Sequence, residues 1–426
     1  MTVAEKSDVG TMIVAMARRA RAAALASARL DARARRRALE AMADAIDAHR
    51  ADISAANALD LSAAEQNGVS GPMLDRLRLG ERAIGKLAEA VREVAAQDDP
   101  LGTIEEETVR PNGLRVGRMR IPLGVVAMIY ESRPNVTADA AALCLKAGNA
   151  VILRGGSEAL HSNRAIANAI REGLAASDVP QDAVQLVPTT DRKAIDVLLE
   201  QDQWIDLVIP RGGESLIRAV TAKSRIPVLQ HYKGVCHVFL DESAPVSRAI
   251  DIVVNSKVQR PGVCNALETL LVHRSAADRL LPPVAQKLVD AGVELRGCPE
   301  TAALLKGVPV TPATEDDWNA EYLDLKLAVR IVDDLEAALD HIARHGSSHT
   351  EAIVTENEAN AKRFVSAVQS STVLVNASTR FADGGELGLG AEIGISTSKL
   401  HAFGPMGARE LTTRKFVVFG QGQVRT

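Results

Sequence analysis

The chain has 426 residues and a formal net charge of −4 at pH 7; 46% of its residues are apolar and 24% are charged. This length allows two or three domains with a large buried core, and the composition is that of a soluble globular protein rather than a disordered one. The slight negative charge gives no electrostatic basis for binding nucleic acid or an anionic membrane.

The N-terminal quarter of the chain is expected to be helical. Residues 9–97 are rich in alanine, and Gly68, Gly71-Pro72 and Gly80 mark the breaks between helices. Residues 103–122 then alternate apolar and polar side chains around Asn112-Gly113. An Asn-Gly pair between alternating segments predicts a β-hairpin.

Continuously apolar strands alternate with helices from residue 124 onward. The predicted strands span residues 124–130, 150–153, 184–187, 205–209 and 235–240, and the predicted helices between them span 135–146, 158–176, 192–200 and 214–222. Strands that are apolar on both faces and alternate with helices indicate a parallel sheet covered on each side.

The same alternation restarts near residue 244 and indicates a second α/β unit. Its predicted helices span 246–258, 276–291, 335–344 and 359–368, and its predicted strands span 267–272, 325–332, 352–355 and 373–375. Residues 414–423 read as a terminal strand. The fold class is therefore α/β, with two doubly wound parallel sheets and a small additional β element.

Cys264 is the most informative single residue. It lies on the short connection between the predicted helix 246–258 and the predicted strand 267–272, after Pro261-Gly262 ends the helix. A thiol on such a connection can project into a cleft and act as a nucleophile. The alternative from local context alone is a small buried apolar side chain.

The cysteines give no sign of a disulfide framework or a zinc site. The four are far apart in the sequence and include no C-x-x-C pair; they are Cys144, Cys236, Cys264 and Cys298. This spacing suits a reducing compartment, and we expect a cytoplasmic protein without a membrane span.

Two strand-to-helix turns are candidates for binding phosphate groups. They contain the runs Arg154-Gly155-Gly156-Ser157-Glu158 and Arg211-Gly212-Gly213-Glu214-Ser215. Glycines let backbone N–H groups approach an anion, and a helix N-terminus favours negative charge. Each turn could also exist without a ligand, but two at the carboxyl ends of one parallel sheet favour a dinucleotide site.

Asn135 and a group of histidines are further candidates. The Asn135 amide could donate a hydrogen bond to an oxyanion, or it could cap the helix that starts there. His341, His345 and His349 recur every four residues, which would suit zinc on a helix. Because Gly346-Ser347-Ser348 interrupts that helix, we expect a capping or substrate-lining role and no metal.

Several runs together resemble the aldehyde dehydrogenase superfamily and, within it, the gamma-glutamyl phosphate reductase family. The runs that carry the resemblance are YESRPNVT at 130–137, KVQRPGVCNALE at 257–268, the segment 332–351, VNASTRF at 375–381 and HAFGPM at 401–406. They extend over essentially the whole chain.

The resemblance implies an NADPH-dependent reduction of L-glutamyl 5-phosphate to L-glutamate 5-semialdehyde and phosphate, a step of proline biosynthesis. It implies that Cys264 forms a thioester and that Asn135 and the Cys264 backbone N–H form the oxyanion hole. The implied cofactor-binding residues are Arg154, Gly155, Gly156, Ser157, Glu158, Arg211, Gly212, Gly213 and Ser215, and the candidates for substrate binding are Arg260, Ser378 and Arg380.

The same resemblance implies the organisation of the chain. Residues 1–102 and 123–243 are expected to form an NADP(H)-binding domain, 244–404 a catalytic domain, and 103–122 with 405–426 a β element that joins subunits of a homo-oligomer. The lability of an acyl phosphate makes hand-over from a glutamate 5-kinase an expected partnership.

The sequence departs from the hydrolytic members of the superfamily at two places. Arg154 stands where they have a lysine, and Gln230 stands where they have a glutamate. The missing carboxylate disfavours the first alternative, a hydrolytic NAD-dependent aldehyde dehydrogenase, although the neighbouring His231 could act as a base. The second alternative, a non-enzymatic nucleotide-binding protein, is disfavoured because Cys264 and Asn135 are both present. Glu158 fits NADPH poorly, since a carboxylate usually accepts a hydrogen bond from the free ribose hydroxyl of NADH.

Overall fold

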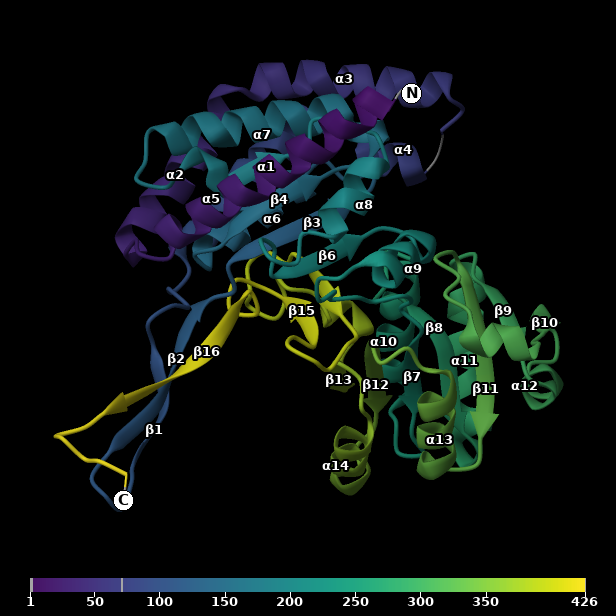
Figure 1. The fold of residues 1–426 in the computed structure, drawn as a ribbon. Coiled ribbons are helices and arrows are strands. Elements are labelled where there is room, and N and C mark those ends of the chain that lie inside the picture. The colour runs from purple at the N-terminus through teal and green to yellow at the C-terminus, as the bar shows by residue number, and fades with distance from the viewer. Residues whose placement is uncertain (1–2, 70–71, 426) are drawn as a thin grey trace. The chain divides into compact units, whose positions relative to one another are not determined.

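The computed structural model describes residues 3–69 and 72–425, and the chain divides into two compact units (Figure 1). Unit 1 contains the residues up to 230 together with 388–394 and the residues from 406 onward. Unit 2 contains residues 231–387 and 395–405. Among the described residues, none of the helices has the length and hydrophobicity that a membrane span requires.

The alanine-rich start of unit 1 is helical, as the sequence predicts. Its helices are α1 (Val3–Ser27), α2 (Ala32–Ala48), α3 (Arg50–Gln66), α4 (Pro72–Leu77) and α5 (Glu81–Ala96). The Asp31 carboxylate caps α2 by accepting a 2.7 Å hydrogen bond from the Ala34 amide. Gly68 follows α3 with a φ of 77°, while the predicted break at Gly71 lies outside the described residues.

A four-stranded parallel sheet forms the centre of unit 1. Its strands run in the order β5 (Val184–Leu186), β4 (Ala150–Arg154), β3 (Val125–Tyr130) and β6 (Leu207–Arg211). The helices α6 (Val136–Lys146), α7 (Leu160–Ala175) and α8 (Lys193–Leu199) connect these strands, and α9 (Glu214–Lys223) follows β6. Every residue of β3 and β4 is buried, which confirms the prediction from their apolar sequence. The strand order reverses at β3, and the carboxyl ends of strands at such a point are where α/β sheets bind ligands.

A small antiparallel sheet completes unit 1. Its strand order is β1 (Ile104–Val109), β2 (Arg115–Pro122) and β16 (Thr412–Phe419). The predicted hairpin is confirmed: Gly113 has a φ of 86°, and its amide donates a 2.8 Å hydrogen bond to the Arg110 carbonyl. The strand β16 pairs with β2, so two segments that lie about 300 residues apart in the sequence are neighbours in one sheet (Figure 1).

Unit 2 is built on a seven-stranded parallel sheet. Its strands run in the order β10 (Val310–Pro312), β9 (Glu294–Gly297), β11 (Lys326–Val332), β8 (Leu267–His273), β7 (Cys236–Leu240), β12 (Thr350–Val354) and β13 (Thr372–Val375). The helices of this unit are α10 (Val246–Val258), α11 (Ala277–Asp290), α12 (Pro299–Leu304), α13 (Leu335–His345) and α14 (Glu358–Ala367). Two further short strands, β14 (Gly394–Ser396) and β15 (Gly404–Met406), pair with each other.

The core of unit 2 fills both faces of this sheet. Along β7, Val238 and Leu240 pack into one apolar cluster with α10 and α11, while Phe239 packs into another with α13 and α14. Alternate residues of one strand therefore lie in different clusters, which explains why the strand is apolar throughout.

The strand at 236–240 corrects one expectation from the sequence. The alternation of elements assigns it to the first sheet, but β7 pairs with β8 and β12 in the second. Fully buried strands of both sheets have the same apolar pattern, so the pattern does not reveal which sheet a strand joins.

Candidate active site

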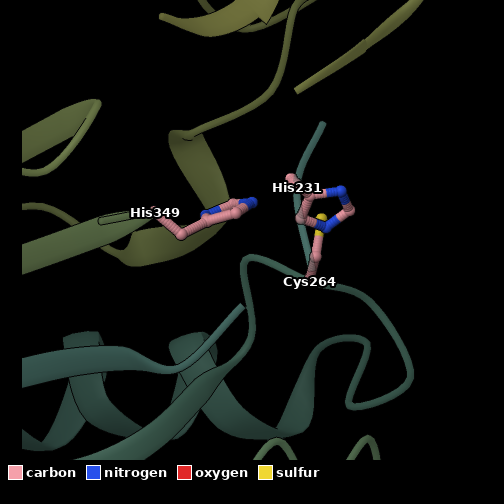
Figure 2. Close-up of side chains that lie close together, drawn as sticks. All are labelled: His231, Cys264 and His349. Atoms are coloured by element: carbon pink, nitrogen blue, oxygen red, sulfur yellow. The ribbon is translucent and has the colours of Figure 1, made fainter. Parts of the chain in front are cut away.

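Three chemically active side chains lie close together at the amino ends of three neighbouring strands of the sheet in unit 2. Cys264 lies three residues before β8, His231 lies before β7, and His349 immediately precedes β12. Because β8, β7 and β12 are parallel neighbours, their amino ends lie side by side. One donor atom from each residue, the Cys264 Sγ and a nitrogen of each imidazole, lies within 4.8 Å of the others (Figure 2).

The loop that carries Cys264 is closed at its base by a buried ion pair. Lys257 in the last turn of α10 and Glu268 at the start of β8 are completely buried, and their Nζ and Oε2 atoms are 2.7 Å apart. Burial raises the pKa of Glu268 and lowers that of Lys257, while their mutual attraction opposes both shifts. Removing one partner of such a pair typically costs about 3–5 kcal/mol, so the pair holds the two ends of the loop together.

Three further contacts position the backbone of Cys264. The Cys236 Sγ donates to the Cys264 carbonyl over 3.2 Å, and the Asn265 Nδ2 donates to the Ala382 carbonyl over 2.9 Å. Gly234 lies so close that a Cβ atom there would stand 1.9 Å from the Cys264 carbonyl oxygen. A side chain at position 234 would therefore displace the loop that carries the thiol.

His349 is the active-site neighbour that the sequence analysis did not assign to Cys264. Its ring is buried, and its Nδ1 lies 2.8 Å from the Thr350 Oγ1 and 3.7 Å from the Cys236 Sγ. The half-buried His231 ring lies opposite, with 5.7 Å between the ring centroids. The sequence does show that His349 lies just before a predicted strand. Its proximity to Cys264, however, depends on the order of the strands in the sheet, which the sequence pattern does not reveal.

The predicted substrate residues differ in their surroundings. Arg260 is exposed on the Cys264 loop, and the half-buried Arg380 donates from Nε to the Gln259 Oε1 over 2.8 Å. Burial lowers the pKa of Arg380, whose charge also interacts with Arg260 and Cys264. Ser378 is buried, and its Oγ accepts from the Arg380 amide and lies 3.0 Å from the Ser256 Oγ. Its hydroxyl group thus caps the short turn that carries Arg380.

In unit 1, Asn135 stands at the start of α6 but its side chain does not cap that helix. The Nδ2 atom instead donates a 2.9 Å hydrogen bond to the Asp139 Oδ2. Burial raises the pKa of Asp139 to about 6, and the charges of Arg211 and Glu392 also act on this carboxyl group. Since an amide nitrogen has two hydrogens, the contact with Asp139 orients the group and leaves a second hydrogen for a ligand.

The carboxyl ends of the unit 1 strands surround a cavity of about 430 Å³. Five of the residues predicted to bind the cofactor line it: Arg154, Gly156, Ser157, Glu158 and Ser215. The other four, Gly155, Arg211, Gly212 and Gly213, are not among its lining residues. Packing accounts for one of them, since a Cβ at position 155 would lie 2.1 Å from the Asn163 Nδ2.

A carboxylate from another segment binds one glycine turn, and a carboxylate of the other turn binds Ser132; the sequence did not predict either contact. The Glu131 Oε2 accepts a 3.0 Å hydrogen bond from the Gly213 amide, and the Glu158 Oε1 accepts from the amide and hydroxyl of Ser132 over 2.5 and 2.8 Å. Glu131 and the cations Arg192 and Lys223, also missed, line the same cavity. The sequence did not identify these residues because charged side chains on loops and helices are typical of any solvent-exposed surface.

Arg154 and Gln230 are both held by nearby groups of unit 1. The Arg154 guanidinium donates to the carbonyls of Gly155 and Thr190 over 3.1 and 3.0 Å, and its burial lowers its pKa. The Gln230 Oε1 accepts a 2.7 Å hydrogen bond from the Thr221 hydroxyl. The group at position 230 is therefore a neutral amide held by Thr221.

Comparisons with known proteins concern the sequence and fold of the whole chain. The model of the aldehyde dehydrogenase family matches residues 2–301. A gamma-glutamyl phosphate reductase of Desulfatibacillum aliphaticivorans is 58% identical over 98% of this chain and 100% of its own length, and one of Geotalea daltonii is 55% identical over the full length of both.

Solved structures extend the likeness to the fold. The crystal structure of gamma-glutamyl phosphate reductase from Thermotoga maritima covers 97% of this chain and 100% of its own, with a TM-score of 0.94 and 44% identity. An acetylating aldehyde dehydrogenase from Geobacillus thermoglucosidasius has a TM-score of 0.70 over 99% of each chain; at 18% identity it shows a shared fold alone.

Proposed function

The chain belongs to the aldehyde dehydrogenase family and, within it, to the gamma-glutamyl phosphate reductases, and we propose that it performs their reaction through a thioester on Cys264. The enzyme reduces L-glutamyl 5-phosphate to L-glutamate 5-semialdehyde, with release of phosphate, in proline biosynthesis. The observation that carries the thioester proposal is the thiol of Cys264 beside two imidazoles, on a loop held in place by buried contacts.

The proposed sequence of bonds is that of acyl transfer followed by reduction. The Cys264 thiolate attacks the acyl carbon, a sulfur–carbon bond forms, and the bond from that carbon to the phosphate oxygen breaks. NADPH, when bound, supplies the hydride that reduces the thioester. Collapse of the resulting thiohemiacetal on Cys264 releases the aldehyde and restores the thiolate.

Several groups of the chain support these steps. The imidazoles of His231 and His349 each place a nitrogen within 4.8 Å of the Cys264 Sγ, and we assign to them the acceptance of the thiol proton after a small approach. We assign the oxyanion donors to the Cys264 backbone N–H and the Asn135 amide, whose orientation Asp139 sets. Arg260 and Arg380 are the cations proposed to bind the anionic groups of the substrate, with Ser378 positioning Arg380.

The absence of a carboxylate at Gln230 protects the thioester from water. Rapid hydrolysis needs a positioned base to activate water, an effect worth typically about 10²–10⁴-fold. The Gln230 amide cannot supply it, and its oxygen is already bound to Thr221. This observation weighs against a hydrolytic aldehyde dehydrogenase.

The enzyme uses a nicotinamide cofactor, and we propose NADPH as the form it prefers. The residues around the cavity in unit 1 fit such a group, because a glycine turn there begins a helix and Arg154 and Arg192 offer cations, while Lys223 is paired with Asp196 over 2.7 Å. The carboxylate of Glu158, which would favour the ribose hydroxyl of NADH, already accepts two hydrogen bonds from Ser132. Both bonds use Oε1 and do not discriminate between the two cofactors, so the preference for NADPH is proposed from the family resemblance.

We also propose that the protein is a cytoplasmic homo-oligomer that receives its substrate from a kinase. The sheet of β1, β2 and β16 exposes Phe416 by 69% and Val418 by 53%, which supports a role in joining subunits of a homo-oligomer. The four cysteines are free, which suits the cytoplasm. A labile acyl phosphate substrate favours direct hand-over from the kinase that produces it.

The proposed nucleophile is tested by replacing Cys264 with alanine. We expect Cys264→Ala to lower turnover at least about 10⁴-fold, as loss of a covalent nucleophile does, without unfolding the protein. Cys298→Ala is the matched control, because this partly exposed thiol lies in the same unit and outside the Cys264 cluster. Near-normal NADPH oxidation by Cys264→Ala would contradict the covalent mechanism.

A further inference from the structure

We propose that Cys264, His231 and His349 form a binding site for Zn²⁺, and that an ion bound there reversibly inhibits the enzyme. The three side chains come from three separate segments of unit 2, and their donor atoms all lie within 4.8 Å of one another (Figure 2). Among residues 9–69 and 74–425, whose side chains the structure describes, no other group of His, Cys, Asp and Glu meets this condition.

The donor set fits zinc better than the common hard cations. A thiolate and two imidazoles suit Zn²⁺, whereas Mg²⁺ and Ca²⁺ require oxygen ligands. Typical Zn–S and Zn–N distances of about 2.3 and 2.0–2.1 Å place tetrahedral ligand atoms about 3.5 Å apart. The three donors therefore need to approach one another by at most about 1.3 Å from the 4.8 Å limit.

The surroundings of the three residues allow this small adjustment. His349 and the Cys264 backbone are held by neighbours: the His349 Nδ1 lies 2.8 Å from the Thr350 Oγ1, and the Cys264 carbonyl accepts from Cys236. His231 is half-buried on the loop before β7, so its side chain can rotate toward the other two. Because two ligands are already held in place and only His231 must move, the rearrangement needed to bind an ion has a small free-energy cost.

Three protein ligands leave the fourth position of a tetrahedral ion to water. Zinc sites with an open position are typically of this kind. Here, however, the ion uses the sulfur lone pair that the proposed reaction needs for attack on the acyl phosphate. Binding at these residues stands on geometry alone, whereas the inhibitory effect rests on the proposed function of Cys264.

The binding is tested by titrating the metal-free, full-length protein with Zn²⁺ in competition with a chromophoric chelator. We expect one ion per chain, with one sulfur and two nitrogen neighbours in its X-ray absorption spectrum. Changes outside the ligand set of a metal commonly cost about 10–100-fold in affinity, so Cys264→Ser, His231→Ala and His349→Ala should each weaken binding at least about 100-fold. Cys298→Ser is the matched control and should not change it.

The results separate the metal site from the proposed function. Unchanged Zn²⁺ binding by Cys264→Ser, binding lost in Cys298→Ser, or no binding at micromolar Zn²⁺ overturns the site and leaves the thioester proposal standing. Cys264→Ser replaces a single atom, and circular dichroism establishes that each variant is folded. If Zn²⁺ binds through the three residues, NADPH oxidation should fall in proportion to occupancy and return with EDTA. Full activity at full occupancy would overturn the inhibition and, with it, the role of Cys264 as nucleophile.

Discussion

The loop that carries Cys264 and the glycine turns of unit 1 hold their active groups in opposite ways. The Cys264 loop is fixed by buried groups, chiefly the Lys257–Glu268 ion pair and the close contact with Gly234. The glycine turns are instead occupied by side chains nearer the surface, of which Glu131 is exposed. One region is rigid because moving it would disrupt a core, and the other can exchange its partners.

This difference corresponds to two tasks. A nucleophile must be held close to its reacting geometry, since a displacement of about 1 Å can cost about 10²-fold in rate. A site that binds and releases a cofactor in every turnover needs groups that can move, which are drawn from the less stable parts of a fold.

Replacing Asn135 tests whether unit 1 contributes a fixed donor as well. Asn135→Ala should lower kcat by about 10²–10³-fold, the usual loss for one oxyanion donor, with a smaller change in the KM of the acyl phosphate. Steady-state kinetics with thermal unfolding of the same variant provide the measurement. A loss of stability with unchanged kcat would contradict the assignment and would mean that the Asn135–Asp139 contact serves folding only.

Two glycine-to-alanine variants compare the regions directly. Gly234→Ala places a Cβ against the Cys264 carbonyl and should lower kcat by about 10²-fold. A Cβ at Gly213 meets nothing within 4 Å, so Gly213→Ala should change kcat less than about tenfold and act mainly on the KM of the cofactor. Equal kcat values for the two variants would show that the Cys264 loop is not held rigidly.

Acid titration tests the support behind the Cys264 loop. Burial opposes ionisation of Asp317, but hydrogen bonds from Thr314, Tyr322 and Arg296 outweigh it and lower the pKa to about 2 from 3.8. A depressed carboxyl pKa stabilises the fold above the unfolded value and loses that effect as the pH falls from about 4 to 2. Asp317→Asn should therefore lower the free energy of unfolding by about 2 kcal/mol at pH 7.

Urea denaturation of the wild-type protein and of Asp317→Asn at pH 7 and at about pH 3 checks this prediction. The difference between their free energies of unfolding should be smaller at the lower pH. A difference that stays constant over this range would mean that the Asp317 carboxylate is not what stabilises the fold. The Tyr322 ring lies 5.8 Å from the Lys257 Nζ, so the same variant reports on the packing around the loop.

The smallest expected effect concerns cofactor preference. A negative charge near the surface is typically worth about 0.2–1 kcal/mol in a pairwise interaction, so Glu158→Gln should raise the ratio of kcat/KM for NADPH to that for NADH by about 1.4- to fivefold. The neutral amide keeps the shape of the side chain and an oxygen that can accept from Ser132. A wild-type enzyme that prefers NADH, or a ratio that falls in Glu158→Gln, would contradict the NADPH proposal.

Local patterns predicted the elements and the position of the thiol, because buried strands and helix ends have signatures within a few residues. Cys264 was identified in this way, as were the two glycine turns. The sheet to which β7 belongs and the meeting of His349 with Cys264 were not predictable, since both depend on the order β8, β7, β12. The positions of Glu131 and Glu158 also depend on contacts between distant segments.

The proposed mechanism requires that Cys264 holds the acyl group until phosphate releases it. The direct measurement is NADPH formation from glutamate semialdehyde and NADP⁺, recorded by rapid mixing without phosphate. We predict a burst of about one NADPH per chain that then stops, because Gln230 activates no water, and steady turnover once phosphate is added. Steady turnover in phosphate-free buffer would contradict this account and would assign the role of hydrolytic base to His231.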